Sequence, residues 1–502
     1  MPRAQAAAFA LGGRVDLDIF RQVASGSRPV SLGREGRRRV AQSRARLLAA
    51  AARGPIYGVN TGFGDLASKR IPPKDLLKLQ RNLVLSHACG VGEPLGEEEA
   101  RGILFLRANE LAKGHSGVRP ELVLRLADLL NSGSVPVIPS RGSVGASGDL
   151  APLAHLALLV LGEGDALHGG RRIPASALLS RLGLKPFVLD AKEGLSLLNG
   201  TQAMQSLGAL ALLSARRVFD AATLACAATL EACAGTPAPF DSRLHSLKPH
   251  PGQMKVAREL RSLLAGSAIR RSHIKNDPRV QDPYSLRAAP QIHGPVWDAI
   301  VSARRTVEIE MNSATDNPLV VGSRVVSGGH FHGEALSLAF DSLATAFAVL
   351  GGVSERRIYL LTAGKAPGLK PFLASRPGLE SGWMIPQVAA AALASENKGL
   401  AHPASADSIP TSAGQEDFVS MGMGAALKLR RAVWNTAQIV AIELLMAARG
   451  VESRAPLKPG RGVARGLARL RREIAPSPED EILSPKMERS RDLVLRGEFS
   501  SP

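Results

Sequence analysis

The segment GLSLLNGTQAMQSLGALALLSA, residues 194–215, contains no charged residue. Its length would suit a membrane span. However, Asn199, Gln202 and Gln205 interrupt the apolar run, and polar groups are costly in lipid. A helix that is apolar on all sides can also be buried inside a large bundle. We therefore predict a buried core helix here and no membrane partner.

Alanine and leucine recur in long runs through the rest of the 502 residues, and only 4% of residues are aromatic. This composition favours helices packed on helices. Apolar periodicity and Gly/Pro punctuation predict two long helices between 192 and 235, a surface excursion or small hairpin within 162–190, and a strand pair at 319–326. Further helices are predicted at 36–52, 75–87, 97–112, 120–131, 296–313, 334–361 and 384–400, and after a polar loop at 403–416 a helix reaches 448.

No repeat or low-complexity linker divides the chain. We predict a mainly α protein that forms one unit over 1–502. Its expected parts are a small mixed N-terminal portion at 1–190, a central long-helix bundle at 191–450 and a charged peripheral tail at 451–502.

The formal net charge of +19 raises the question of nucleic-acid binding. The denser basic patches, 34–39 and 461–472, are not interleaved with the aromatic residues of a strand-binding platform, so we interpret them as solvated surface. Cys89, Cys226 and Cys233 form neither a metal spacing nor an even disulfide set, which suits a reducing compartment. The N-terminal apolar run is too short for a secretion signal, and we predict a cytoplasmic location.

A glycine-rich turn, GSVGASGDLAPLAH at 142–155, leads into a predicted helix. A serine-hydrolase elbow would need glycine two residues after Ser147, where Asp149 stands. Alternatively, the amide nitrogen of Gly148 could attack the Ala146 carbonyl, because glycine has no side chain to obstruct it. Loss of two waters would then leave an electrophile, which no standard side chain provides. A helix-capping turn is the other interpretation of this stretch. The helix predicted to begin at 149–152 would direct its positive end towards the triplet.

The three tyrosines are Tyr57, Tyr284 and Tyr359, and the first two fall in Gly- or Pro-bearing loops. Catalytic residues concentrate in loops, although packing in the core is the usual role of tyrosine. Arg287 follows Tyr284 by three positions, and its guanidinium would suit a carboxylate or simply lie at the surface.

Two other polar residues are candidates for the site, and two histidines are considered as metal ligands. His87 ends an apolar helix and could be a buried histidine or a ligand. Glu416 lies in a polar loop before a helix, where capping alone would explain it. His330 and His332 alternate and have no evident third ligand, so we predict no metal site.

Together these motifs resemble the aromatic amino-acid ammonia-lyases, and within them the histidine ammonia-lyases (histidases) most of all. The resemblance extends from about 54 to 449 and rests on the blocks YGVNTGFG, LQRNLVLSHACGVG, GSVGASGDLAPLAH, KEGLSLLNGTQA, VQDPYSLR, NSATDNPLV, SGGHFHGE, SERR, ASENK and PTSAGQEDFVSMG. It implies a long-helix bundle of the ammonia-lyase/aspartase-like type and a homotetramer whose active sites are shared between subunits.

The resemblance also implies that L-histidine is converted to trans-urocanate and ammonia by 4-methylideneimidazol-5-one, formed autocatalytically from Ala146-Ser147-Gly148 without an external cofactor. Tyr57 matches the catalytic base, and we expect nearby positive potential to lower its pKa. Arg287 matches the carboxylate anchor, while His87 and Glu416 match residues that read the imidazole. The residues assigned as catalytic are Tyr57, Ala146, Ser147, Gly148, Tyr284 and Glu416, and those assigned to substrate binding are His87, Asn199, Gln281, Arg287 and Phe331.

Three positions depart from the histidase pattern: His330 where asparagine is usual, Trp383 where phenylalanine is usual, and Phe418 where histidine is usual. They bear on substrate preference more than on reaction class. The alternatives within the class are a tyrosine or phenylalanine ammonia-lyase and an aminomutase. A non-catalytic basic binding protein is the alternative from a different class.

Overall fold

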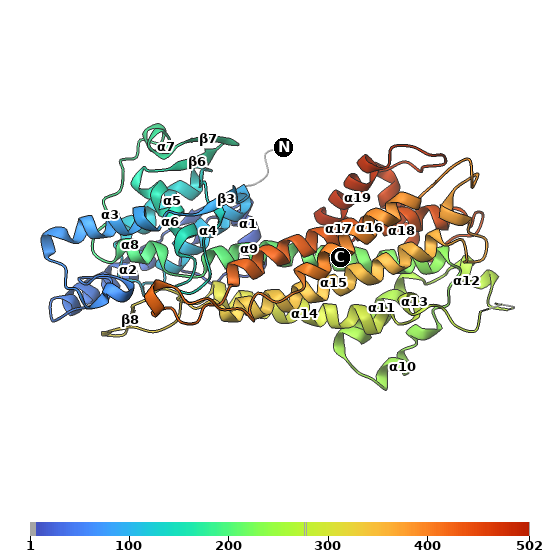
Figure 1. The fold of residues 1–502 in the computed structure, drawn as a ribbon, viewed down its shortest axis with the longest axis horizontal. Coiled ribbons are helices and arrows are strands. Elements are labelled where there is room, and N and C mark those ends of the chain that lie inside the picture. The colour runs from blue at the N-terminus through green and yellow to red at the C-terminus, as the bar shows by residue number, and fades with distance from the viewer. Residues whose placement is uncertain (1–6, 276, 278, 501–502) are drawn as a thin grey trace. The chain divides into compact units, whose positions relative to one another are not determined.

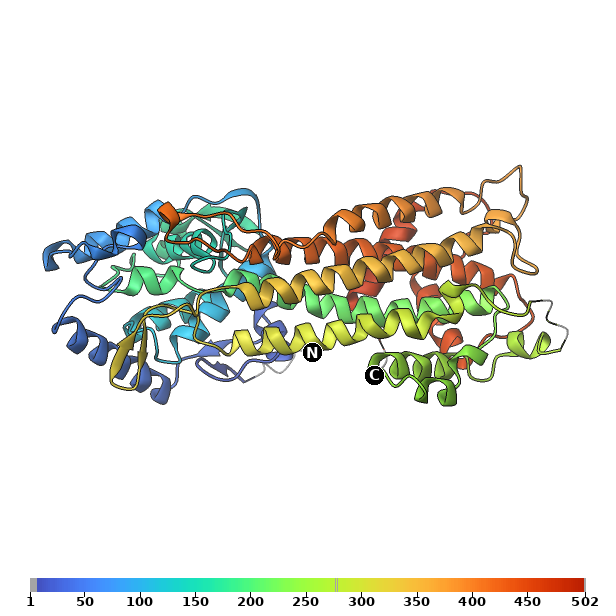
Figure 2. The same cartoon turned by 60° about the horizontal axis from the view of Figure 1, so that its bottom comes forward.

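The computed structural model describes residues 7–275, 277 and 279–500 (Figures 1 and 2). The chain forms two compact units. The first unit comprises Met1–Leu210, Arg304–Phe340 and Pro403–Leu427, and the second comprises Ala211–Ala303, Asp341–His402 and Lys428–Pro502. The described residues are mainly helical, which confirms the predicted fold class.

Four long helices form the core of the second unit and contribute most of their length to it: α9 Gln202–Ala232, α14 Ala289–Met311, α15 Glu334–Thr362 and α17 Gly422–Glu452. A buried polar cluster joins them. Arg357 on α15 donates to both carboxylate oxygens of Glu443 on α17, over 2.6 and 2.9 Å. Thr229 on α9 donates to Glu443 over 2.8 Å, and His293 on α14 lies 3.2 Å from Arg357. The four helices are therefore packed together at this level.

The remaining helices of the second unit surround this core. Apolar residues of α18 and α19 are buried, including Val463, Leu470, Leu493 and Val494, so the C-terminal segment packs as part of the unit. The bounds are α10 Ser242–Ser246, α11 Pro251–Leu263, α12 Ala268–Ser272, α13 Tyr284–Arg287, α16 Met384–Leu400, α18 Arg461–Glu473 and α19 Ser484–Arg496, with the 3-10 helices η3 Ala238–Phe240 and η4 Pro371–Leu373.

The first unit combines shorter helices with small sheets. Its helices are α1 Leu17–Ala24, α2 Arg34–Ala51, α3 Leu76–His87, α4 Glu97–Leu111, α5 Pro120–Asn131, α6 Leu150–Leu161, α7 Ala175–Arg181 and α8 Glu193–Leu198, with the 3-10 helices η1 Gly64–Ser68, η2 Pro73–Asp75 and η5 Ser412–Gly414. Helices α3, α6 and α8 pack against one another. α4 begins at three glutamates, where the Gly96 N–H donates to the Glu99 carboxylate over 2.8 Å.

The strands of the first unit are short. β1 Phe9–Ala10 pairs in parallel with β2 Val30–Ser31, and β3 Val91–Pro94 pairs antiparallel with β5 Pro139–Arg141. β6 Asp165–His168 lies between β4 Val135–Pro136 and β7 Arg171–Pro174 in an antiparallel sheet. β8 Leu319–Val321 pairs antiparallel with β9 Arg324–Val326. The hairpin predicted within 162–190 and the strand pair predicted at 319–326 are both confirmed.

Residues 194–215 are almost entirely buried, as predicted. The expectation of two long helices between 192 and 235 is wrong, because α8 has only six residues and α9 has 31. The chain breaks between them at Asn199, Gly200 and Thr201. Gly200 adopts a φ of +155°, which only glycine tolerates readily, and this conformation interrupts the helix.

Helix α15 is long and apolar enough to cross a membrane by length and composition alone. However, 56% of its most apolar stretch is buried inside the protein. Buried core helices of large proteins have the same composition, so this helix is weak support for a membrane span.

Candidate active site

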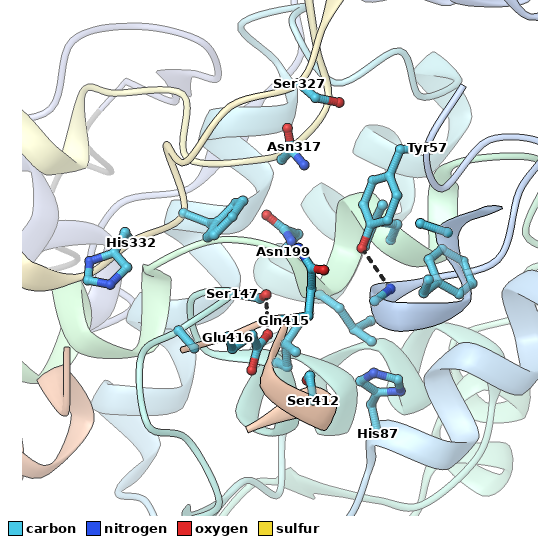
Figure 3. A pocket seen from close by; sticks show the side chains of 18 of the residues that line it. Tyr57, His87, Ser147, Asn199, Asn317, Ser327, His332, Ser412, Gln415 and Glu416 are labelled. Carbon is cyan, nitrogen blue, oxygen red and sulfur yellow. Dashed lines mark hydrogen bonds between the residues drawn. The ribbon is translucent and has the colours of Figure 1, made fainter. Parts of the chain in front are cut away.

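A cavity of about 540 Å³ lies within the first unit (Figure 3). Its walls come from the loop that follows α2, the end of α3, the turn before α6, the end of α8 and two loops from distant parts of the sequence. The polar and aromatic residues that line it are Tyr57, Phe63, His87, Ser147, Asn199, Asn317, Ser327, Phe331, His332, Ser412, Gln415, Glu416, Asp417 and Phe418.

The Ala146-Ser147-Gly148 turn lies between this cavity and the break that precedes α9. Gly148 has a φ of +71°, and a side chain there would overlap the carbonyl group of Gly200. The two glycines form an isolated parallel bridge, and the N–H of Asp149 donates to the Gly200 carbonyl over 2.7 Å. Helix α6 begins at Leu150, as predicted, so its positive end is directed at the triplet.

Asp149 is buried directly after the triplet. One carboxylate oxygen accepts from the Ser143 hydroxyl over 3.0 Å, and the other accepts from the Met204 N–H over 2.9 Å. Burial raises the pKa of Asp149 to about 7, and these hydrogen bonds oppose the shift. The side chain therefore ties the start of α6 to the start of α9.

Glu416 reaches the triplet from a loop distant in sequence. The Ser147 hydroxyl donates to one of its carboxylate oxygens over 2.5 Å (Figure 3). The Thr411 hydroxyl donates to the other over 2.5 Å. Both oxygens are therefore oriented, and one of them lies at the reactive turn.

Tyr57 lies across the cavity, where its phenol oxygen accepts a hydrogen bond of 3.2 Å from the Gly64 N–H (Figure 3). Burial raises the pKa of Tyr57, the Gly64 hydrogen bond opposes the increase, and the negative charge of Glu416 adds to it. The expectation of a lowered pKa is wrong for these surroundings, because the charged group that acts on the phenol is a carboxylate.

His87 is the last residue of α3, and its Nδ1 lies 2.8 Å from the Leu83 carbonyl. A carbonyl can only accept, so Nδ1 carries the proton and Nε2 is left as an acceptor in the neutral ring. Burial lowers the pKa of His87, which favours this neutral form, although Leu83 and Glu416 act in the opposite direction.

Asn199 and Phe331, which the resemblance assigned to substrate binding, also line the cavity. The Asn199 side-chain oxygen is buried and has no hydrogen-bond partner among the residues that the structure describes. An unpaired buried acceptor is costly, so it favours a ligand that donates a hydrogen bond there.

Gln281, Tyr284 and Arg287 belong to the second unit and are not among the residues that line this cavity. Tyr284 is 74% exposed, and the Arg287 guanidinium lies 5.3 Å from the centre of its ring. The first unit therefore brings together Tyr57, the triplet, His87, Asn199, Phe331 and Glu416 without these three residues.

Of the three unusual positions, Phe418 lines the cavity and stacks on His332 with ring centres 6.2 Å apart. His330 is exposed and does not line the cavity. Trp383 is buried in the second unit, where its backbone N–H donates to the Phe372 carbonyl over 2.8 Å. A change in cavity polarity can therefore be traced directly to Phe418.

Sequence reasoning did not select Asn317, Ser327, His332, Ser412 or Gln415, all of which line the cavity. Each lies in, or next to, a motif already noted for its loop character, in the segments NSATDNPLV, SGGHFHGE and PTSAGQEDF. The signal that could have found them is the concentration of small and polar residues in these loops.

Residues 15–472 match the sequence model of the aromatic amino acid lyase family. The chain is accordingly an enzyme of the carbon–nitrogen lyase class. It belongs to the aromatic amino acid lyase family, as the resemblance predicted.

Among its relatives, histidine ammonia-lyase of Myxococcus xanthus is 50% identical over 491 residues, which cover 97% of this chain and 96% of that protein. The crystal structure of histidine ammonia-lyase from Trypanosoma cruzi has a TM-score of 0.90 at 40% identity and covers 98% of this chain and 94% of its own. Tyrosine aminomutase from Streptomyces globisporus has a TM-score of 0.92 at 36% identity and covers 98% of both chains. The fold is therefore shared by proteins with different substrates.

Proposed function

We propose that this chain removes ammonia from L-histidine and releases trans-urocanate. The observation that carries the proposal is the convergence of His87, Glu416 and Ser147 on one cavity: two groups suited to an imidazole ring beside a turn suited to cyclisation. The 50% identity to histidine ammonia-lyase of Myxococcus xanthus supports the same substrate.

We assign 4-methylideneimidazol-5-one, formed from Ala146, Ser147 and Gly148, as the reactive group. The turn fits it, because Gly148 has a positive φ, its missing side chain leaves room for the Gly200 carbonyl, and α6 directs its positive end at the triplet. The group supplies an electrophile towards the substrate and makes the amino group a leaving group. Backbone N–H groups at the start of α6 are suited to hold negative charge that develops there.

His87 and Glu416 select the ring of the substrate. The neutral His87 ring offers Nε2 as an acceptor, and Glu416 offers a carboxylate, so both complement the two N–H groups of a protonated imidazole. A phenyl ring would leave the His87 Nε2 acceptor without a partner and would offer no charge to Glu416, which would keep only hydroxyl contacts such as that with Thr411. An unpaired polar group in the cavity disfavours phenylalanine by more free energy than the loss of one methylene contact between a substrate and an apolar pocket would.

Tyr57 is the proposed base that takes the β-proton. Burial and Glu416 both raise the pKa of its phenol, so the free cavity holds it protonated. A protonated imidazole bound to Glu416 would neutralise the second of these causes. Binding of the correct substrate would thus make the phenol easier to deprotonate.

We further propose a cytoplasmic homotetramer in which Gln281, Tyr284 and Arg287 complete the active site, with Arg287 binding the substrate carboxylate. Large apolar side chains are exposed on α14, α15 and α16 of the second unit, and such side chains often mark subunit interfaces. Sedimentation of the purified protein tests the tetramer. The exposed residues are Val301, Val349, Tyr359, Ile385 and Val388.

A cytoplasmic location is supported by the three cysteines, which are free thiols.

A panel of L-histidine, L-tyrosine and L-phenylalanine, scored for ammonia and for product identity, tests the substrate. We expect ammonia and urocanate from histidine with the parent enzyme and none with Ser147→Ala. The exposed Ser180→Ala on α7 serves as a control that retains activity. Cinnamate or coumarate as the main product would assign a different ammonia-lyase, and a β-amino acid would assign an aminomutase. Salt-sensitive nucleic-acid binding without ammonia release would favour the non-catalytic alternative.

A further inference from the structure

Arg107 is a fully buried cation on α4, at the back of the first unit's reactive turn. Its Nη1 donates to the Asn199 carbonyl over 2.7 Å and to the Gln202 side-chain oxygen over 2.9 Å. These two acceptors lie on either side of Gly200. Moreover, a side chain at Gly200 would overlap Nη1, so the guanidinium packs directly against this glycine.

Gly200 is in turn the surface against which the triplet is held. Its carbonyl accepts from the Asp149 N–H over 2.7 Å, and Gly200 bridges Gly148. The contacts therefore run in order from Arg107 to the Asn199–Gly200 break and then to Gly148. Movement of this break would change the position of the nitrogen that must attack.

A network of buried partners fixes Arg107 itself. Glu110, one turn further along α4, lies 3.4 Å from its guanidinium. The Glu110 carboxylate accepts from the N–H groups of Thr315 and Asp316 over 2.7 and 3.0 Å, and Gln202 donates to it as well. Arg107 is therefore held by two acceptors at Nη1 and by the ion pair with the oriented Glu110 carboxylate, whereas its Nε and Nη2 make no hydrogen bond among the described residues. These contacts fix the position of Nη1 against the break.

We propose that Arg107 is a positioning residue for ring closure at the triplet, acting through the Asn199–Gly200 break. The inference rests on the proposed function, because it concerns how that function's reactive group is made. Hydrogen bonding of Arg107 to Asn199 and Gln202 holds Gly200 in place, and Gly200 keeps Gly148 facing the Ala146 carbonyl carbon. Positioning of this kind lowers the entropic cost of bringing reacting atoms together.

Ring closure at the triplet, the reaction that Arg107 would assist, needs no oxidant. A bond forms between Gly148 N and the Ala146 carbonyl carbon, and the Gly148 amide proton moves to the Ala146 oxygen. That oxygen leaves as water with the Ser147 amide proton. A second water takes the Ser147 hydroxyl and the proton from its Cα, which leaves the exocyclic double bond. The chain thus loses two waters in all.

Intact mass of the purified chain measures this loss directly. Arg107→Met removes the cation, and Arg107→Lys keeps the charge but not the guanidinium fork. Arg44→Met is the matched control in the same unit, because Arg44 is also buried and donates to the carbonyls of Gly117 and Ala191 and to Asp190. Only chains that elute and melt as folded protein are compared.

We expect the parent enzyme and Arg44→Met to lack two waters. The fraction of chains that lack them should fall at least tenfold in Arg107→Met and to an intermediate level in Arg107→Lys. Activity per ring-bearing chain should stay within twofold of the parent, which a general defect in the fold would not allow.

Two outcomes overturn the inference: a folded Arg107 variant that loses both waters as completely as the parent, or failure of both variants to fold, since the residue would then hold the core and not the turn. A parent enzyme that retains both waters would instead overturn the proposed function.

Discussion

The hydroxyl of Ser147 donates a 2.5 Å hydrogen bond to Glu416, which lies 269 positions further along the chain. This contact places a negative charge at the edge of the reactive turn. The same charge acts on the pKa of two other groups that line the cavity: it adds to the increase that burial causes at Tyr57, and it opposes the decrease that burial causes at His87. Glu416 is therefore an electrostatic link between the proposed base, the ring-binding histidine and the triplet.

Replacing Glu416 by glutamine should lower the pKa of Tyr57, because a negative charge that disfavours the phenolate is removed. A base acts when deprotonated, so activity rises as the pH passes its pKa. We expect the rising limb of the kcat/KM profile for histidine to move to lower pH, although the maximum falls. An unchanged or alkaline-shifted limb would show that Tyr57 is not the titrating base.

Replacing His87 by leucine should remove the Nε2 acceptor and reduce kcat/KM for histidine by roughly 10- to 100-fold, equivalent to about 1–3 kcal/mol for an unpaired buried hydrogen-bonding group. Activity on phenylalanine should fall less or increase. His155→Leu is the control, since His155 lies on α6 outside the lining of the cavity and accepts from the Gly90 N–H. Equal losses for both substrates would contradict a role in ring selection.

Asp149 should make the free energy of unfolding depend on pH. Its pKa is about 7 in the folded chain against an ordinary 3.8, so the folded state binds the proton more tightly. The stability that this provides is present below about pH 4 and is lost as the pH rises to 7, by on the order of 4 kcal/mol for about three pH units.

We expect Asp149→Asn to gain stability relative to its parent between pH 4 and pH 8 in urea unfolding. Both chains should carry Ser147→Ala, so that neither contains the ring. A stability difference that does not change with pH would mean that the carboxyl group titrates normally.

Arg357→Met should destabilise the second unit by about 3–5 kcal/mol, because it leaves the carboxylate of Glu443 buried without its partner. Thermal and urea unfolding measure the loss. Arg38→Met removes an arginine from an exposed pair with Glu35 on α2 and should leave the melting temperature unchanged. Similar losses from both substitutions would show that burial of the Arg357 pair has no special weight.

Helical periodicity predicted much of the fold correctly. The bounds of α16 agree with the predicted 384–400, and α6 begins at the predicted turn. Local patterns suffice there, because apolar spacing and Gly/Pro punctuation act over a few residues. The break at Asn199–Gly200 could not be found this way, since it depends on contacts with Arg107 and Asp149 that are distant in sequence.

The same distinction between local patterns and distant contacts applies to the active site. Motifs identified the residue types that the first unit brings around one cavity, including Tyr57, Ser147 and Glu416. The predicted direction of the Tyr57 pKa shift was wrong, because the sign of the shift depends on which charge lies nearby and on how deeply the phenol is buried. A sequence motif gives neither the nearby charge nor the depth of burial.

The Gly148–Gly200 bridge determines when, relative to folding, the proposed ring can form. Its two partners meet only when α6 and α9 have assembled, so the proposed ring can close only in a chain that has already folded. The covalent change then survives later denaturation. The presence of the ring in a chain would therefore show that this chain had once reached its native state, and mass spectrometry would detect it even in an aggregate or a proteolytic fragment.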